Sequence, residues 1–278
     1  MLAGIGVTSR MCTVDGVWTS LIEIGTGPPL VLLHGGIECG GALWAPVLAG
    51  LGERHRVVVP DLPGLGESSP VDALNVNRFT GWFDGLLRAA GLEQPTVVAH
   101  SLGGSLAAAA ATHWNGRIRR LVIYAGPAVG PYRMPLRLRY VATRFALRPT
   151  RRNGNRYDRY ALRDLDATRR RDPHWYAAYE SYNLAQASKP HVKQTMSRLV
   201  DAGTRSIPGT ELDGITVPVS LLWGRDDRMV PLRTAQIASA RHGWPLHVID
   251  DAAHVPHVEQ PERFVAALTR IETPTSDV

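Results

Sequence analysis

Val97-Val98-Ala99-His100-Ser101-Leu102-Gly103-Gly104 runs from β-branched apolar residues through a serine into two glycines, and an alanine-rich segment follows. The apolar start is typical of a buried strand, and the alanine run is typical of a helix. A strand that turns at once into a helix holds a serine hydroxyl above the edge of a sheet, and small neighbours allow that tight turn. Ala99 replaces the first glycine of the pattern G-x-S-x-G, and serines beside glycines also occur in ordinary loops. Ser101 is therefore a candidate nucleophile that needs support from the rest of the chain.

Short apolar runs alternate with helical patterns on both sides of this turn. The runs lie at residues 17–24, 30–33, 57–59, 97–99, 121–124, 217–223 and 246–249, and the expected helices lie near 76–90, 102–113, 231–241 and 261–271. Apolar strands separated by helices indicate a mostly parallel sheet covered on both faces. The sequence thus predicts an α/β fold. In such a sheet ligands bind at the carboxyl ends of the strands, where His34, Ser101 and Asp227 emerge.

The alternation stops between about residues 126 and 213, where helical patterns rich in arginine, tyrosine and alanine take over. Residues 126–210 hold 15 Arg and two Lys against six acidic residues, although the net charge of the whole chain is only +6. This asymmetry predicts an inserted module with its own surface chemistry. We expect an α/β core made of residues 1–126 and 214–278, with a helical cap inserted at 127–213.

Composition and length exclude several classes of protein. The 278 residues suffice for one large core, and no run of about 20 apolar residues is present to span a membrane. The first ten residues lack the features of a secretory signal, so we expect a cytoplasmic protein. Cys12 and Cys39 lack metal-ligand spacing, and the chain has no phosphate-binding glycine loop or nucleic-acid motif. We therefore expect no metal, no cofactor and no nucleic-acid partner.

A serine nucleophile needs a histidine to take its proton and a carboxylate to orient that histidine. In proteins with a strand-to-helix elbow, the three residues follow in the order serine, acid, histidine. Here Asp226 and Asp227 follow the expected strand at 217–223, and His254 follows the one at 246–249. The order is met, and both aspartates are candidates for the carboxylate.

Five motifs follow one another along the chain. They are His34-Gly35-Gly36, Asp61-Leu-Pro-Gly-Leu-Gly-Glu-Ser68, the elbow at Ser101, Trp223-Gly-Arg-Asp-Asp-Arg-Met-Val-Pro231, and His254 followed by Glu259-Gln-Pro261. With these motifs, nearly the whole chain resembles the α/β-hydrolase fold family with a helical cap. The resemblance implies that Ser101 is the nucleophile, that His254 is the general base and then acid, and that Asp227 orients it. Asp226 is the rival for this third role.

Acyl transfer also creates a negatively charged oxygen, which preorganised hydrogen-bond donors must stabilise. The resemblance implies that the backbone N–H groups of Gly36 and Leu102 are these donors. Four further residues near the motifs are candidates for the substrate pocket: His34, Gly35, His100 and Trp44. For His34 the competing interpretation is structural, with its ring hydrogen-bonded to the loop backbone.

An arginine-rich amphipathic helix is expected at 134–148. Its apolar face carries Leu138, Val141, Ala142 and Phe145, and its other face carries Arg137, Arg144 and Arg148. We interpret it chiefly as a lid packed over the pocket with solvated arginines outside, because surface helices are normally amphipathic. Docking on an anionic membrane surface and attraction of an anionic substrate are the alternatives.

The expected function is hydrolysis of a carboxylic ester, lactone or thioester of a small molecule through an acyl-enzyme on Ser101. Carbon–carbon bond hydrolases of this fold, which act on carboxylate-bearing dienoic keto acids, are the first alternative. They commonly have asparagine where this chain has His100. Acyl transfer and a small-molecule receptor that keeps the triad are further alternatives, because fold alone does not determine function. The natural substrate and the oligomeric state are left open.

Overall fold

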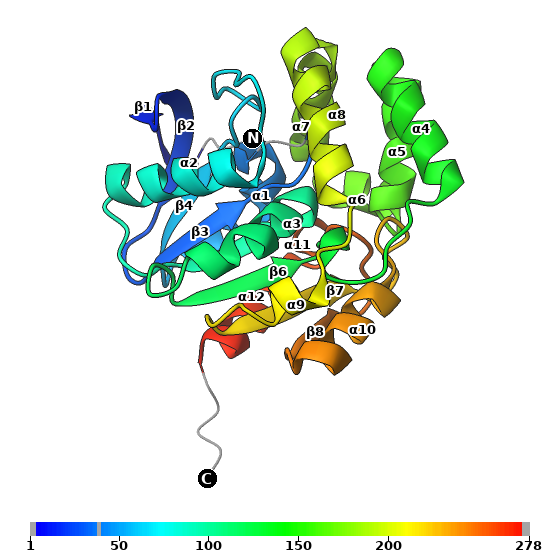
Figure 1. Cartoon of the computed structure of the whole chain (residues 1–278). Coiled ribbons are helices and arrows are strands. Elements are labelled where there is room, and N and C mark those ends of the chain that lie inside the picture. The colour runs from blue at the N-terminus through cyan, green and yellow to red at the C-terminus, as the bar shows by residue number, and fades with distance from the viewer. Residues whose placement is uncertain (1–3, 38–39, 274–278) are drawn as a thin grey trace.

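The apolar runs of the sequence form strands of one sheet (Figure 1). The computed structural model describes residues 4–37 and 40–273, and in these residues the sheet has eight strands. The strands are β1 (Thr8–Val14), β2 (Val17–Ile24), β3 (Pro29–Leu33), β4 (Arg56–Pro60), β5 (Thr96–His100), β6 (Arg120–Tyr124), β7 (Val219–Gly224) and β8 (Leu246–Ile249). Their order is β1-β2-β4-β3-β5-β6-β7-β8, with β2 antiparallel to β1 and β4 and the other neighbours parallel. The predicted α/β class with a mostly parallel sheet is confirmed.

Helices cover both faces of this sheet. They include α1 (Gly40–Gly52), α2 (Val76–Ala89), α3 (Ser101–Ala110), α10 (Leu232–His242), α11 (Pro256–Glu259) and α12 (Pro261–Glu272). α1 packs with α11 and α12 on one face, and α2 packs with α3 on the other (Figure 1). Trp44, Phe83 and Phe264 are fully buried between these helices and the sheet. Burial of such large apolar side chains is the main stabilising contribution to this core.

Two elements were not expected from the sequence. β1 is exposed over most of its length, so it lacks the apolar alternation that identifies a half-buried strand. α1 contains Pro46 and several glycines, which are unfavourable in a helix interior. α1 forms nevertheless because Leu43, Trp44 and Leu48 are buried, and tertiary packing outweighs the weak local propensity.

Between β6 and β7 the chain leaves the sheet and forms helices. After the short helix η2 (Pro127–Val129) come α4 (Leu136–Leu147), α5 (Arg151–Ala161), α6 (Leu165–Arg171), α7 (Pro173–Ser188), α8 (Pro190–Gly203) and α9 (Gly209–Leu212). We call residues 136–212 the helical insertion. Its buried side chains Leu138, Val141 and Leu199 belong to the same apolar core as the sheet. α4, α5, α7 and α8 stand together above one edge of the sheet (Figure 1). The division into domains at residues 126 and 213 stays a prediction.

No helix in residues 4–37 and 40–273 combines the length and the apolar character needed to cross a bilayer.

Candidate active site

Ser101 lies at the junction of β5 and α3, where the strand passes directly into the helix. Its φ angle is +53°, in the left-handed region that non-glycine residues rarely adopt. The conformation costs roughly 1–2 kcal/mol, and such strain is typical of functional positions. The turn is packed tightly, because a Cβ atom on Gly35 would lie 2.3 Å from the carbonyl oxygen of His100. Ala99 is fully buried, so its methyl group is accommodated where the pattern has glycine.

Ser101, His254 and Asp227 form one chain of hydrogen bonds. Ser101 Oγ lies 3.0 Å from His254 Nε2, and His254 Nδ1 lies 2.8 Å from Asp227 Oδ2. The other carboxylate oxygen of Asp227 accepts hydrogen bonds from the backbone N–H groups of Met229 and Val230, at 2.8 and 2.9 Å. A carboxylate only accepts, so Nδ1 of His254 carries the proton and Nε2 accepts from the serine. Only 4% of His254 and 6% of Asp227 is exposed, which strengthens these interactions.

The two aspartates that the sequence left as rivals have different partners. Asp227 contacts His254, whereas Asp226 is 44% exposed and pairs with Arg163 at 2.8 Å. The geometry therefore gives Asp226 a surface contact, away from the hydrogen-bonded chain.

Glu259 joins the loop before His254 to the helical insertion. Its buried carboxylate accepts hydrogen bonds from the backbone N–H of Ala253, at 2.6 Å, and from that of Arg163, also at 2.6 Å. His254 itself donates its backbone N–H to the carbonyl oxygen of Ala161 at 2.9 Å. Burial raises the pKa of Glu259, although these N–H groups oppose the shift. Sequence reasoning missed this link because its partners lie about 90 residues apart and no periodicity connects them.

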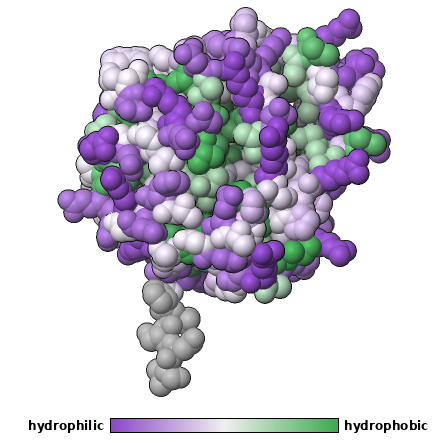
Figure 2. Space-filling view, viewed as in Figure 1, coloured by the Kyte–Doolittle hydropathy of each residue, from purple (hydrophilic) through white to green (hydrophobic). Residues whose placement is uncertain are grey.

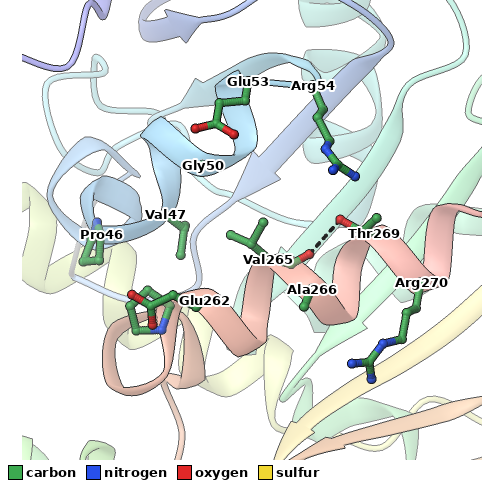
Figure 3. Close-up of a pocket in the computed structure, with 11 residues that line it drawn as sticks. Pro46, Val47, Gly50, Glu53, Arg54, Glu262, Val265, Ala266, Thr269 and Arg270 are labelled. Carbon is green, nitrogen blue, oxygen red and sulfur yellow. Dashed lines mark hydrogen bonds between the residues drawn. The ribbon is translucent and has the colours of Figure 1, made fainter.

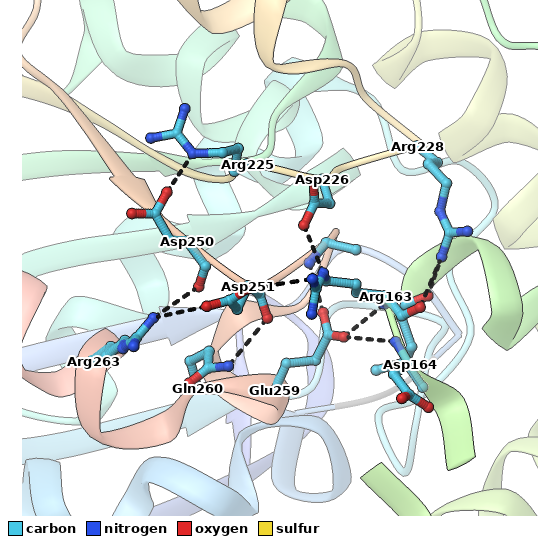
Figure 4. A network of polar contacts seen from close by, with 12 residues as sticks. Arg163, Asp164, Arg225, Asp226, Arg228, Asp250, Asp251, Glu259, Gln260 and Arg263 are labelled. Atoms are coloured by element: carbon cyan, nitrogen blue, oxygen red, sulfur yellow. Dashed lines mark hydrogen bonds and ion pairs between the residues drawn. The ribbon is translucent and has the colours of Figure 1, made fainter. Parts of the chain in front are cut away.

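Charged side chains surround the same junction (Figure 4). Arg163 reaches Asp226 and also lies 3.3 Å from Asp251, and Arg228 donates to the carbonyl oxygen of Leu162. Exposed ion pairs contribute little each, but several arginines bonded to backbone and carboxylates fix one geometry. The connection between α5 and α6 is thus held against the loops that carry the candidate acid and base.

Two buried histidines lie beneath the hydrogen-bonded chain. His100 donates from Nε2 to the carbonyl oxygen of His254 at 3.1 Å, and the Tyr124 hydroxyl bonds Nδ1 of His257 at 2.9 Å. Burial lowers the pKa of His257 to about 3, and burial together with His254 lowers that of His100 well below its usual range. Both rings are therefore neutral near pH 7 and add no charge beside His254. Trp44 packs against His257, with the two rings tilted by 34° and their centroids 4.4 Å apart.

A cavity of about 400 Å³ opens over Ser101 and His254. Gly36 and Leu102, the expected oxyanion donors, line it together with His100. Its walls come mainly from two helices of the insertion, with Leu138 and Phe145 from α4 and Met196 and Val200 from α8. Arg139, Lys193 and Asp201 are its charged lining residues. Figure 2 shows hydrophobic residues around a hollow in this region, with hydrophilic residues outside them.

Three of the four expected pocket residues do not line this cavity, which corrects the sequence-based expectation. His34 is fully buried below the loop, where Nδ1 donates to the carbonyl oxygen of Gly36 and Nε2 accepts from the N–H of Leu62. Gly35 is buried under the elbow, and Trp44 lies behind the two histidines. Burial lowers the pKa of His34 to about 4, so its role is to hold the loop as a neutral ring. Strand-end position predicts proximity to the site but not which side of the loop a residue occupies.

A second depression lies between α1 and α12 (Figure 3). It has a volume of about 610 Å³, and Pro46, Glu53, Arg54, Glu262 and Arg270 are among its lining residues. None of the residues that line it is a serine, cysteine or histidine, so it holds no serine–histidine or cysteine–histidine pair. In the described part of the chain, no group of three His, Cys, Asp or Glu side chains is arranged to hold a metal ion. Cys39 lies outside the described residues.

The sequence and the fold have known relatives. The sequence model of the Alpha/beta hydrolase family matches residues 30–267. The 2-hydroxy-6-oxo-2,4-heptadienoate hydrolase of Pseudomonas putida is 28% identical over 92% of this chain and 93% of that protein. The pimeloyl-(acyl-carrier protein) methyl ester esterase of Aeromonas hydrophila is 27% identical over 88% of this chain and 96% of that protein.

The fold is also shared with solved structures. A carboxylesterase from Bacillus subtilis has a TM-score of 0.80 and 23% identity, with 97% of this chain and 92% of that chain covered. This likeness concerns the fold, while the family model covers most of the sequence. The chain belongs to the alpha/beta hydrolase family.

Proposed function

We propose that the protein is a serine hydrolase that cleaves a carboxylic ester, lactone or thioester of a small molecule. The observation that carries this proposal is the hydrogen-bonded chain from Asp227 through His254 to Ser101 at the floor of an apolar cavity. In this arrangement a weak nucleophile has a base within reach, and the base has a fixed orientation.

The first half of the reaction forms an acyl-enzyme. Ser101 Oγ attacks the carbonyl carbon of the substrate while His254 Nε2 takes the hydroxyl proton. Asp227 stabilises the imidazolium that forms, and its two backbone hydrogen bonds hold its carboxylate in place. The negative oxygen of the tetrahedral intermediate is stabilised by the backbone N–H groups of Gly36 and Leu102. His254 then returns the proton to the leaving alcohol or thiol, and the acyl group stays on Ser101.

The second half of the reaction releases the acid. A water molecule gives its proton to His254 Nε2 and attacks the acyl carbon, and the same backbone groups stabilise the second oxyanion. Collapse of this intermediate breaks the bond to Ser101 Oγ, which recovers its proton from His254. His100 and His257 stay neutral throughout, because their burial disfavours the charged form.

The lining of the cavity favours substrates with an apolar acyl group. Among the lining residues, Arg139 is exposed and Lys193 is half-buried, and no fully buried arginine or lysine is among them. A substrate carboxylate held deep in the cavity would therefore lose its hydration without gaining a buried cationic partner. The cavity lining therefore favours esters over dienoic keto acids.

Carbon–carbon bond hydrolysis is the second candidate. It is favoured by the 28% identity to the 2-hydroxy-6-oxo-2,4-heptadienoate hydrolase of Pseudomonas putida. Both reactions use the same serine and histidine, so only a comparison of substrates separates them.

The test is the release of p-nitrophenol from acetyl, butyryl and octanoyl esters, with 2-hydroxy-6-oxo-2,4-heptadienoate assayed beside them. Wild type should turn over the esters repeatedly, with an initial burst where breakdown of the acyl-enzyme is slow. Ser101→Ala should lower kcat/KM by roughly 10,000-fold or more. Ser197→Ala, an exposed serine that also lines the cavity, is the matched control and should keep near wild-type activity.

The outcomes separate the candidate functions. Ester hydrolysis that survives Ser101→Ala would overturn the assignment of the nucleophile. Turnover of the dienoate alone would favour the second candidate. Binding of ligands without turnover of any substrate would favour a receptor.

A further inference from the structure

The outer face of α4 carries an exposed apolar stripe. Leu136, Tyr140 and Leu147 are 68%, 58% and 73% exposed, and they are three of the six large apolar side chains exposed in the described residues. At 3.6 residues per turn these three lie within roughly 40° of the helix circumference. The opposite face is buried through Leu138 and Phe145. A lid helix surrounded by water needs only its inner apolar face. Packing within the protein therefore does not account for the exposed apolar stripe on the outer face.

Arginines flank this stripe without acidic neighbours in the sequence. The chain has no Asp or Glu between residues 94 and 157. From the start of α4 to residue 157, by contrast, arginines are numerous. Arg139 lies on one side of the stripe, and Arg137 and Arg148 lie on the other, by the same helical geometry. Within the described residues these three arginines form no ion pair. The stripe is therefore apolar along its centre and positively charged along both edges.

We propose that the outer face of α4 docks on a bilayer surface rich in anionic phospholipid. Leucines at the centre of the face would enter the boundary between headgroups and acyl chains, while the long arginine side chains reach the phosphates. Charge complementarity argues for this occupant. A second copy of the chain would bring the same arginines together, and like charges would oppose the contact.

The position of α4 gives this docking a functional consequence, which rests on the proposed ester hydrolysis. Leu138 and Phe145 line the cavity from the inner face of α4, and Arg139 and Leu147 belong both to the cavity lining and to the outer face. The edge of the cavity thus lies beside the docking face. Esters dissolved in the bilayer would reach Ser101 without crossing bulk water, which names lipophilic esters as the substrate class.

Sedimentation of the full chain with vesicles tests the docking independently of catalysis. The probes are vesicles of phosphatidylcholine alone and of equal parts phosphatidylcholine and phosphatidylglycerol. Wild type and Ser101→Ala should both bind the anionic vesicles, bind phosphatidylcholine weakly, and dissociate when salt rises from about 50 to about 500 mM, where surface charges are screened. Because Ser101→Ala should bind normally, a failure of docking is distinguishable from a failure of the proposed hydrolysis.

Paired variants locate the docking face. Arg137→Gln with Arg148→Gln should weaken binding to anionic vesicles by roughly 25-fold, because each arginine near such a surface contributes about a fivefold factor. Leu136→Ser with Leu147→Ser should weaken it by roughly tenfold. The controls change an exposed apolar residue and an exposed arginine elsewhere, Trp18→Ser on β2 and Arg88→Gln on α2. Melting temperatures equal to wild type would show that each variant is folded.

Three results would overturn the proposal. They are absence of binding to the anionic vesicles by a folded wild type, binding that the α4 variants and the controls change equally, and binding to soluble polyglutamate without binding to vesicles. The last result would identify an acidic protein as the partner.

Discussion

Asp226 and Asp227 are adjacent carboxylates with different surroundings. The side chain of Asp227 is buried and bonded to His254 and two backbone N–H groups, while Asp226 is half in solvent and paired with Arg163. A negative charge beside the histidine stabilises the imidazolium of the transition state, whereas an exposed ion pair contributes little. The proposed mechanism therefore makes opposite predictions for the two neighbours.

Asp227→Asn should lower kcat by roughly 10,000-fold, because an amide neither stabilises the imidazolium nor holds the required tautomer. Asp226→Asn, the matched control, should keep kcat within about threefold of wild type and lose at most about 1 kcal/mol of stability. Steady-state kinetics on a p-nitrophenyl ester and urea unfolding measure both. Equal losses of kcat in the two variants would contradict the assignment of Asp227.

At this scale, chain order is the part of the sequence that points to the candidate catalytic residues, and their roles stay a prediction. The elbow at Ser101 and the order serine, acid, histidine predicted the three residues that the structure brings together. Sequence reasoning failed for Trp44 and His34, because burial on one side of a loop depends on the whole packing and not on the distance from a strand end. The wall from α4 was expected as a lid helix with Leu138 and Phe145 on its apolar face, and both residues line the cavity. The wall from α8 was not expected, because no pattern in the sequence shows which insertion helix packs over the elbow.

At the scale of elements, Glu259 connects the helical insertion to the loop that carries His254. Its carboxylate accepts hydrogen bonds from backbone N–H groups at the start of α6 and before His254, so the insertion and the candidate base share one buried anchor.

β1 and α1 are elements that the sequence alone does not predict. Both are stabilised by their neighbours and carry weak local signals, so no window of sequence identifies them.

Glu259→Gln should destabilise the protein by about 1–3 kcal/mol, because the amide N–H₂ group would face a buried backbone donor. It should also lower kcat by up to about a hundredfold, since the loop that carries His254 loses its anchor. Urea unfolding and steady-state kinetics give the two values. Glu262→Gln, on the exposed first turn of α12, should change neither. A variant with reduced stability and unchanged kcat would mean that Glu259 does not position the histidine.

At the scale of the whole molecule, stability should depend on neutral buried histidines. Burial lowers the pKa of His257 to about 3 and that of His34 to about 4, against about 6.5 in the unfolded chain. Below pH 6.5 the unfolded state therefore binds protons that the folded state does not. The free energy of unfolding then falls with falling pH, from about 6.5 down to the folded pKa.

In His257→Gln, the unfolded state should lose the one proton that the His257 ring binds below pH 6.5. Between pH 6 and pH 4.5 the slope of unfolding free energy against pH should decrease by about 1.4 kcal/mol per pH unit relative to wild type. Urea unfolding at several pH values measures this slope. The exposed His174→Gln variant should retain the wild-type slope. If the His257→Gln and wild-type slopes coincide, His257 is not the neutral buried group described here.

The hydrogen bond from the backbone N–H of His254 to the carbonyl oxygen of Ala161 joins the last part of the chain to the insertion, which is synthesised earlier. The ribosome completes Ser101 and the entire insertion before it makes Asp227 and His254. An emerging chain therefore contains its serine for more than a hundred residues without any base to activate it. Under the proposed mechanism, Ser101 is activated only after the segment that carries His254 has packed against the insertion.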